Sequence, residues 1–389
     1  MPPGAALVDE RLSELSGDFD FLLCVTPVNL EQAWTEFRAS RYRQEPGFVY
    51  RPLPDNLAGR SQALQELPLD GVEDPVLCEL LSEKRDELER RTELVALRGS
   101  PKFRLGALRH YGAVDEELRG LAEELRRNTE KCARTPANEK CLDAHDLAQC
   151  VRKELQRYRE EYPGFPVTVE IRDDITAGMM VSRDRLLISR TVRLRESRVY
   201  ALLEHEVGTH LVTYYNGACQ PFKQLRFGLA GYEALQEGLA TLAEFVAGGL
   251  EPKHMRKLAA RVAAVVSMSG GASFAETFAL MRDGWSFSTR DSFHITIRVY
   301  RGGGLTKDAI YLKGLRNLLQ HLAASPDLEP LLVGKVALSH LPLLHDLRQR
   351  GLIEKPRALP RYWTEFETRE RLEHCASLTL SQLLGEVRS

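Results

Sequence analysis

The sequence lacks any uninterrupted apolar run of about eighteen residues, the minimum for a membrane-spanning helix. It also lacks a strong excess of one charge, because 53 Lys and Arg against 55 Asp and Glu give a formal net charge of -2. No overall field therefore attracts nucleic acid or an anionic membrane. Near the N-terminus, Asp9 and Glu10 precede any basic and then apolar stretch of a secretory signal. We expect no nucleic-acid partner, no membrane partner and no export.

Cysteine is scarce and irregularly spaced. An odd total of 7 favours free thiols in a reducing compartment over a disulfide framework. The nine-residue steps between Cys132, Cys141 and Cys150 match no zinc-finger spacing, so we expect these three to pack within helices. Internal repeats and low-complexity segments are absent from the sequence. The sequence predicts a cytoplasmic location.

What is present is typical of a soluble globular protein, with 43% hydrophobic and 28% charged residues. The 389 residues suffice for one large domain or two ordinary ones. From Glu31 to about Tyr162, Leu, Glu and Arg recur at helical spacing. The pattern changes after that, which predicts a mostly helical N-terminal region over 1–162 and a second domain over 163–389. We assign no chemistry to the first region.

The second region begins with strand patterns. Residues 167–172 alternate with period two, and residues 179–182 and 185–189 flank a short polar turn, which predicts a hairpin. An extended peptide could add to an edge of that hairpin as a further strand. Helical patterns follow over residues 197–215, 232–247, 252–268, 274–282, 293–300, 307–323 and 340–351. We predict an α+β fold, predominantly helical, with a small antiparallel sheet beside a helix pair of the zinc-protease kind.

A candidate metal motif lies at His205-Glu-Val-Gly-Thr-His210, an H-E-x-x-x-H arrangement one residue longer than the usual zinc-protease motif. On a regular helix, histidines five positions apart point about 140° apart, whereas histidines four apart share a face. One inserted residue in a π-bulge restores a common face, and such bulges occur mostly at functional sites. Gly208 lowers the steric difficulty of that distortion. If the histidines bind a metal, the helix must be irregular here.

The apolar surroundings predict that this motif is buried. Its apolar neighbours are Leu202, Leu203, Val207 and Leu211. A buried His–Glu pair is unfavourable unless it is paired or metal-bound; the alternative is two core histidines beside a surface glutamate. Glu237, on the next predicted helix, completes the two-His, one-carboxylate set of zinc hydrolases. We predict that His205, His210 and Glu237 hold zinc. Glu206 would be the base that activates the attacking water.

Neighbours of Glu237 receive supporting roles in this prediction. Glu233 and Thr241 stand four residues either side of it, and we expect them to orient the ligating histidines. Gly238 would allow the backbone of its helix to approach that of the histidine helix closely.

These motifs together resemble the QEGLA-motif family of zinc peptidases, which includes the microtubule-associated tyrosine carboxypeptidases of animals. The resemblance covers roughly residues 167–360. It rests on His205–His210, Asn216-Gly217, Gln220-Pro221, Gly228–Gly231, Gln236–Ala240, Met179–Ser182, Arg298–Gly304, Thr306–Asp308 and Tyr311-Leu312. His205 and His210 match the zinc histidines of the family, Glu206 its catalytic glutamate and Glu237 its third ligand.

The resemblance implies a metallocarboxypeptidase that acts on the C-terminus of a peptide or protein and releases a terminal tyrosine or another aromatic residue. Family members of animals remove the terminal tyrosine of α-tubulin. The N-terminal half matches the family only loosely, so the sequence does not assign tubulin as a partner.

A basic segment after residue 293 suggests how a terminal carboxylate is recognised. Arg298 and Arg301 stand three apart, near enough on a helix to converge on a carboxylate. The three glycines that follow expose backbone N–H groups, and Lys307 opens the next helix, whose N-terminus also favours an anion. Tyr300 or Tyr311 would donate to the oxyanion. The alternative is that one arginine pairs with a nearby Asp or Glu.

Other functions remain open. The lengthened motif also resembles the zinc helix of dipeptidyl peptidase III, which suggests a dipeptidyl peptidase or aminopeptidase, although the basic segment argues against it. A non-catalytic regulatory protein that keeps zinc for structure is a further alternative, against which Glu206 argues. A phosphate loop at 301–304 lacks the required spacing to Lys307.

Overall fold

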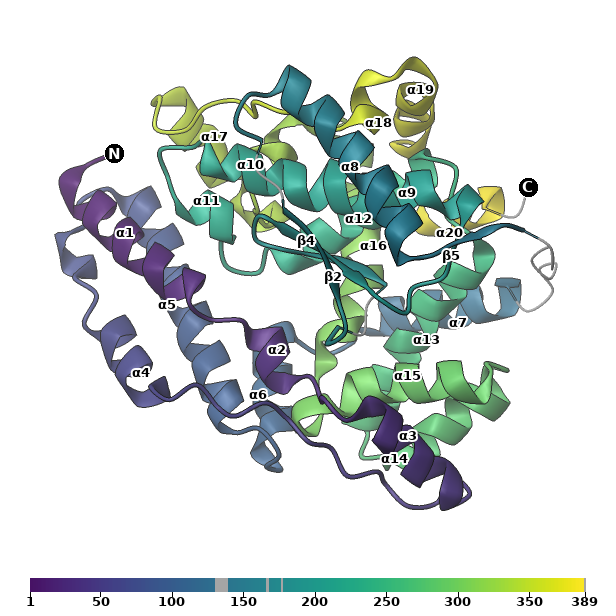
Figure 1. Ribbon diagram of the computed structural model, residues 1–389. Coiled ribbons are helices and arrows are strands. Elements are labelled where there is room, and N and C mark those ends of the chain that lie inside the picture. Colours follow the sequence, from purple (N-terminus) through teal and green to yellow (C-terminus); the bar gives the residue numbers. More distant parts are fainter. Residues whose placement is uncertain (130–138, 166–167, 176–177, 388–389) are drawn as a thin grey trace.

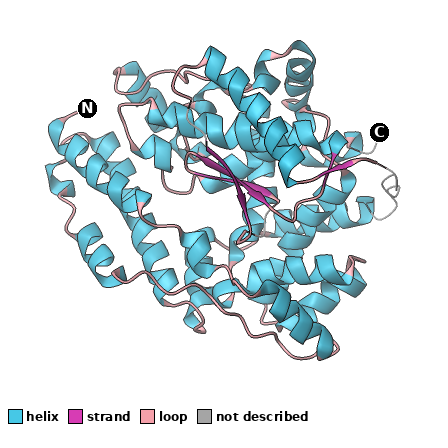
Figure 2. Cartoon of the chain, viewed as in Figure 1, coloured by secondary structure: helices cyan, strands magenta, loops and turns pink. Residues whose placement is uncertain are grey.

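Figures 1 and 2 show a largely helical chain with a few short strands in a computed structural model. The structure describes residues 1–129, 139–165, 168–175 and 178–387. The predicted α+β class with a predominance of helix is confirmed. Within the described residues no helix is both long and apolar enough to cross a membrane.

The N-terminal helices are α1 (Pro3–Gly17), α2 (Phe21–Val25), α3 (Leu30–Ala39), α4 (Leu57–Gln65), α5 (Pro75–Ala96), α6 (Lys102–Tyr111), α7 (Glu116–Thr129) and α8 (Ala144–Glu161). Of these, α1 to α6 lie on the left and along the lower edge of Figure 1, whereas α7 lies on the right and α8 in the upper part. Local signals set several of their starts. Asp74 caps α5 by accepting from the N–H groups of Val76 and Leu77, with Pro75 at the first helical position.

The second half begins with strands and continues as helices. The strands are β1 (Cys141–Leu142), β2 (Thr168–Arg172), β3 (Met179–Ser182), β4 (Arg185–Ser189) and β5 (Leu194–Arg195). The helices are α9 (Val199–Leu203), α10 (Val212–Ala218), α11 (Gln224–Phe227), α12 (Glu233–Val246), α13 (Pro252–Ser269), α14 (Phe274–Ala279), α15 (Thr289–Tyr300), α16 (Ile310–Ala324), α17 (Leu341–Gln349), α18 (Arg361–Thr364), α19 (Phe366–Cys375) and α20 (Leu380–Glu386).

The sheet near the centre of Figure 1 has the strand order β2-β4-β3. The predicted hairpin is confirmed, since β3 pairs antiparallel with β4 and Val181 lies opposite Leu186. β2 pairs with β4 in parallel, so the sheet is mixed rather than purely antiparallel. Residue 167, the predicted start of the first strand, lies outside the described residues. A second sheet, β1 with β5, was not predicted from the sequence.

Segments far apart in the chain share one hydrophobic core. Leu12 of α1, Leu77 of α5 and Leu118 of α7 belong to the same buried cluster as Leu239 of α12 and Leu315 of α16. A separate aromatic cluster joins α3 to α14 and α15 through buried phenylalanine rings. Both sides of the boundary predicted at residue 162 therefore pack in the main core.

Two glycines set the distance between α12 and α16. A Cβ on Gly238 would lie 2.6 Å from the backbone of Gly314, and a Cβ on Gly314 would lie 1.8 Å from the carbonyl oxygen of Ala234. Only glycine permits this contact. Gly238 thus allows a close approach of α12 to α16, and the prediction that it would serve the approach to the histidine helix was wrong.

The cysteines that the structure describes are free. They are Cys24, Cys78, Cys141, Cys150, Cys219 and Cys375. Cys150 lies in a helix and packs against a hydrophobic cluster, as predicted, whereas Cys141 is exposed on β1. Cys132 lies outside the described residues.

Candidate active site

The segment that carries the two histidines is a π-helix, Glu204–Leu211, between α9 and α10. This confirms the irregular helix that the motif requires. Gly208 lies where a Cβ would approach a carboxyl oxygen of Glu204 to 2.4 Å, so the bulge and the buried Glu204 leave no room for a side chain. Because a π-helix holds more residues in each turn than an α-helix, both imidazoles point to one face. Their ring centroids are 5.1 Å apart.

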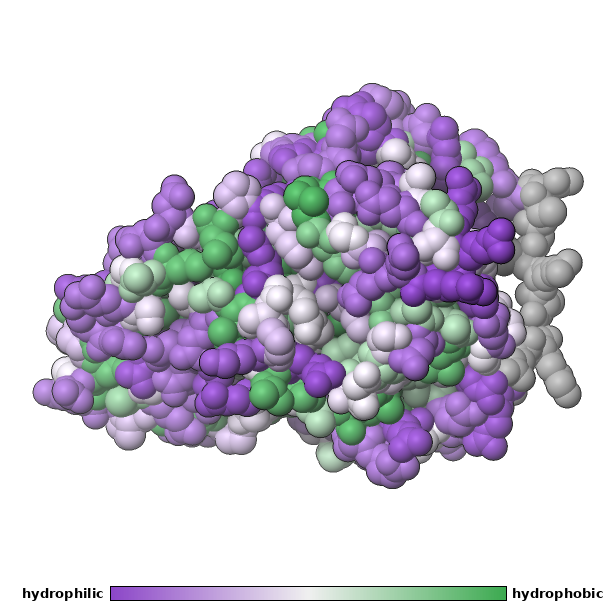
Figure 3. All heavy atoms as spheres, turned by 90° about the horizontal axis from the view of Figure 1, so that it is seen from below, coloured by the Kyte–Doolittle hydropathy of each residue, from purple (hydrophilic) through white to green (hydrophobic). Residues whose placement is uncertain are grey.

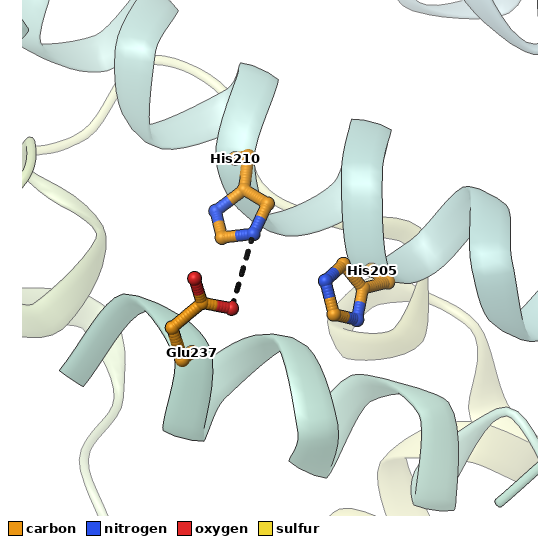
Figure 4. Close-up of side chains that lie close together, drawn as sticks. All are labelled: His205, His210 and Glu237. Atoms are coloured by element: carbon orange, nitrogen blue, oxygen red, sulfur yellow. Dashed lines mark ion pairs between the residues drawn. The ribbon is translucent and has the colours of Figure 1, made fainter. Parts of the chain in front are cut away.

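The two histidines meet Glu237 in the gap between the π-helix and α12, as Figure 4 shows. One ligand atom from each of His205, His210 and Glu237 lies within 4.8 Å of the others. His210 Nε2 is 3.9 Å from Glu237 Oε2. Tetrahedral zinc with bonds of about 2.1 Å needs ligand atoms about 3.4 Å apart. The donor set fits zinc, and modest side-chain movement would close the remaining distance.

A buried carboxylate orients the first histidine. His205 Nδ1 lies 2.8 Å from Glu244 Oε1, while Arg198 donates to the other oxygen of Glu244 at 2.6 Å. Burial alone would raise the pKa of Glu244, but His254, His205 and Arg198 hold that pKa well below its usual range. An anionic Glu244 favours the tautomer of His205 that leaves Nε2 free for a metal.

The second histidine is held by an amide. His210 Nδ1 lies 3.4 Å from the side-chain oxygen of Gln236, which also accepts from the hydroxyl of Thr213 at 2.8 Å. The roles predicted for Glu233 and Thr241 were wrong. Glu233 pairs with cations on other helices, and the Thr241 hydroxyl donates to the backbone carbonyl of Glu237 instead of reaching a histidine.

Glu206 lies beside the three candidate ligands and is almost fully buried. Its Oε2 accepts from the N–H of Val181 in β3 at 3.1 Å, and its Oε1 is 4.0 Å from His205 Nε2. Burial raises the pKa of Glu206 to about 7, with His205 opposing the shift and Glu237 adding to it. A carboxyl that titrates near neutrality and is fixed by a backbone donor is suited to proton transfer.

Arg298 and Arg301 converge as predicted, but the group they converge on is the buried carboxylate of Asp308. Arg298 forms a two-point contact with Asp308, from Nε to Oδ2 at 2.5 Å and from Nη2 to Oδ1 at 2.9 Å. Arg301 lies 3.8 Å from Asp308 and also donates to the hydroxyl of Thr26. Arg261 of α13, which the sequence did not single out, is a third cation 3.9 Å from Asp308. One carboxylate thus faces three guanidinium groups, which leaves an excess of positive charge.

The glycines after Arg301 form a packed turn. Gly302 has a φ of 73° and a Cβ there would lie 2.4 Å from the ring of Phe103, so the position requires glycine. Its N–H donates to the hydroxyl of Tyr50 at 3.0 Å. The expected row of free N–H groups is therefore not available at Gly302.

The remaining predicted residues divide into two groups. Tyr311 lies near Glu237, whose charge helps burial to raise the pKa of the phenol. Its ring is 5.7 Å from Lys307 Nζ, which itself pairs with Glu233 at 2.9 Å. Tyr300 points away, because its hydroxyl bonds to Thr277 and to the carbonyl of Ala272 beside α14. This geometry contradicts an oxyanion role for Tyr300.

The N-terminal half contributes to the surroundings of the site, although we assigned it no chemistry. Arg91 of α5 donates to Glu233 at 2.8 Å and to Glu87 at 3.2 Å. Lys84 pairs with Glu87 at 2.7 Å, and both are almost fully buried. The Arg91–Glu233 pair holds the first turn of α12 against α5.

Two imidazoles, a carboxylate and an adjacent glutamate are the residue set of metallopeptidase centres. The chain belongs to the family described as microtubule-associated tyrosine carboxypeptidase, whose model matches residues 35–379. Human microtubule-associated tyrosine carboxypeptidase 1 is 30% identical over 242 residues, which cover 58% of this chain and 48% of the human protein. The rat protein of the same name is 27% identical over 226 residues, which cover 54% and 46% respectively.

The chain thus spans about half the length of the curated relatives it matches. Among solved structures, one protein of unknown function from Shewanella oneidensis aligns with 83% of this chain and 73% of its own length. The identity is 14% and the TM-score 0.39, a likeness too weak to support any argument.

Proposed function

We propose that this protein is a zinc-dependent metallocarboxypeptidase that hydrolyses the C-terminal peptide bond of peptides or proteins. The observation that carries the proposal is the convergence of His205, His210 and Glu237 beside the buried Glu206. The relatives that carry the name tyrosine carboxypeptidase support it and suggest an aromatic last residue.

The residues of the chain divide the chemical work. Zinc, when bound, would polarise the scissile carbonyl and lower the pKa of an attacking water. Glu206 would accept the proton of that water and pass it to the leaving amine. The N–H of Val181 holds the carboxylate of Glu206 in place. Tyr311 is the phenol that would donate to the developing oxyanion.

The excess positive charge around Asp308 supports recognition of a terminal carboxylate. Arg261, Arg298 and Arg301 share this single carboxylate, and among the described residues neither Arg261 Nε nor Arg301 Nε has a hydrogen-bond partner. A substrate carboxylate would supply a second anion through charge-assisted hydrogen bonds. Lys307, whose Nζ lies 5.7 Å from the centroid of the Tyr311 ring, would add positive charge while it remains paired with Glu233.

The free edge of β3 supports binding of an extended peptide. In an antiparallel pair, alternate residues direct their N–H and C=O groups away from the partner strand. The carbonyl of Gly178 accepts from the N–H of Ser189 in β4. Met179 and Val181 therefore direct their N–H and C=O groups to the free edge. There the N–H of Val181 donates to Glu206. A peptide added along this edge would bring a carbonyl group next to Glu206.

The test compares metal content with cleavage. The wild type should hold about one zinc per chain, and His205→Ala and Glu237→Ala should lose it. Glu206→Gln should keep the zinc and lose hydrolysis of a peptide that ends in tyrosine. Full zinc loading of the two ligand variants, or near wild-type turnover by Glu206→Gln, would contradict the assignment.

The direction of attack is tested with modified twins of the same peptide. C-terminal amidation removes the charge that the arginines would bind, so cleavage should fall by about tenfold or more. N-terminal acetylation should have little effect. The reverse pattern would indicate an aminopeptidase or dipeptidyl peptidase.

A further inference from the structure

The face of the molecule shown in Figure 3 has no continuous apolar surface, because its hydrophobic residues form separate small groups. A feature that the proposed chemistry does not use lies inside the molecule instead. Glu204 is the first residue of the π-helix, directly before His205, and it is only 1% exposed. Glutamates are almost never fully buried unless they are paired. The burial of Glu204 therefore requires an explanation.

Pairing with a cation does not supply that explanation. Among the residues that the structure describes, Glu204 forms no ion pair, and its Oε2 has no hydrogen-bond partner. Glu154 of α8 and Arg361 of α18 lie close enough for their charges to act on it. The guanidinium of Arg361 is already engaged, however, since it contacts Glu154 at 2.7 Å and Glu365 at 2.7 Å. An apolar side chain of similar size would avoid the cost of burying this carboxyl group.

The carboxyl group of Glu204 packs against Gly208, within the π-helix itself. A Cβ built on Gly208 would lie 2.4 Å from Oε2 and 3.4 Å from Cδ of Glu204. Pro360, just before α18, borders the same space, with its own Cβ 3.6 Å from that position. The side chain of Glu204 thus fills the space that a side chain at residue 208 would need, and the two residues form one packed pair.

The backbone of Glu204 is held in the π-helical register as well. In a π-helix each carbonyl accepts from the N–H five residues further on, which for Glu204 is that of Thr209. The buried hydroxyl of Thr209 donates to this same carbonyl at 3.1 Å. In an α-helix the carbonyl would accept from Gly208 instead. A return to that register would bring residues 204 and 208 closer together, where the carboxyl group already lies.

The register decides whether the two histidines can share a metal. Figure 4 shows both imidazoles on the side of the π-helix that faces α12. With the regular spacing of an α-helix, His205 and His210 would point about 140° apart. A residue that favours the π-helical register therefore affects the metal site without touching the metal.

We propose that Glu204 is a positioning residue, whose carboxyl group packs on Gly208 and holds the π-helix in the register that brings His205 and His210 together. The proposal rests on the zinc centre of the proposed function and adds to it a residue that acts through the backbone. Glu244 and Gln236, in contrast, contact the imidazole rings directly.

The experiment measures metal binding in variants of the packed pair. Glu204→Ala empties the space beside Gly208 and should lower zinc affinity by about 10- to 100-fold, as measured by competition with a chromogenic chelator. Glu204→Gln keeps the shape of the side chain and should bind zinc nearly as well as the wild type. Cobalt in place of zinc gives a visible spectrum that depends on the geometry of its ligands. That spectrum should change in Glu204→Ala and not in Glu204→Gln.

Gly208→Ala disturbs the same contact from the other residue and leaves Glu204 in place. Its new methyl group meets the carboxyl group, so it should weaken zinc binding and change the cobalt spectrum as well. In the double variant Glu204→Ala, Gly208→Ala, this methyl group occupies the emptied space. Its loss of zinc affinity should therefore be smaller than the two single losses together, as expected for residues in contact.

Glu154→Ala is the matched control. Glu154 is also buried, at 5% exposure, and Arg361 retains Glu365 as a partner without it. This variant should unfold more easily and keep the cobalt spectrum of the wild type.

Wild-type zinc affinity and cobalt spectra in both Glu204→Ala and Gly208→Ala would overturn the role of Glu204 and leave the carboxypeptidase proposal intact. Additive losses in the double variant, or an equal spectral change in Glu154→Ala, would do the same. A wild-type protein that binds no zinc would overturn both proposals.

Discussion

The imidazole of His205 and the carboxylate of Glu244 lie 2.8 Å apart, and Glu244 stands seven residues after Glu237 on the same helix. We expect Glu244→Ala to lower zinc affinity by about 10- to 100-fold, because His205 loses the group that orients it. Glu244→Gln keeps an acceptor and should lose less. Competition with a chromogenic chelator measures the affinity, and Glu329→Gln, whose carboxylate pairs with Arg348 and, in the described part of the chain, with no histidine, is the control. Unchanged affinity in Glu244→Ala would contradict this role.

The contact between α12 and α16 gives a prediction on stability. Gly314→Ala should destabilise the fold by at least about 1–3 kcal/mol, since the new Cβ meets the carbonyl of Ala234. Gly120→Ala, on the exposed face of α7 with no atom near its Cβ, should instead stabilise by about 0.5–1 kcal/mol. Urea unfolding of the two variants checks the opposite signs. Equal effects would show that α12 and α16 can move apart without a loss in the free energy of unfolding.

The shared carboxylate of Asp308 should be essential for folding stability. Asp308→Ala would leave the buried Arg301 and the half-buried Arg261 and Arg298 without their shared counter-ion, for which we expect a loss of about 3 kcal/mol. Glu373→Gln breaks the exposed pair with Arg369 and should change stability by less than about 0.5 kcal/mol. Thermal unfolding of both proteins measures the difference. A stable Asp308→Ala protein would mean that the arginines do not need their partner.

Asp9 provides a pH-dependent prediction. It is 1% exposed, and burial raises its pKa to about 6, although the N–H groups of Lys223 and Gln224 oppose the shift. A carboxyl whose pKa is higher in the folded state favours folding most at low pH. Its contribution is fully present below about pH 4 and is lost as the pH rises through 6, by about 3 kcal/mol in all.

Asp9→Asn should remove that dependence. The stability of the wild type relative to this variant should therefore fall between pH 4 and pH 7, as urea unfolding at each pH would show. The exposed Asp70→Asn should follow the wild-type curve. A constant difference between wild type and Asp9→Asn would refute the prediction.

The sequence predicted the centre of the site because the signals there are local. The five-residue spacing of His205 and His210 required a π-helix for a common face, and the structure has one. Glu237 stood out as a carboxylate in an apolar helix. Glu244 followed the same logic two turns further on and could have been found from its spacing. Glu233 was misassigned because helical spacing predicts which face of the helix a residue lies on. It does not predict which side chains of other elements pack against that face.

The parts that were missed depend on contacts between distant segments. Arg261 and Lys335 have no local pattern, and only the packing of α13 and of the loop after residue 332 brings them near Glu237. The parallel pairing of β2 with β4 likewise depends on how the chain returns to the sheet. The helix expected to start at residue 293 begins at Thr289, where Ser288 accepts from the N–H of Asp291 as a cap.

The π-helix also sets the orientation of the helix that follows it, α10. Asn216, in α10, donates to the carbonyls of Leu332 and Ala358 and accepts from the N–H groups of Arg357 and Ala358. Deleting one residue to shorten the motif to H-E-x-x-H would rotate Asn216 by about 100° relative to α9. All four bonds would then be lost, even if the two histidines still met. Two requirements thus fix the length of the motif, the common face of the two histidines and the bonds of Asn216. A shorter motif would require a different C-terminal segment to pack against this helix.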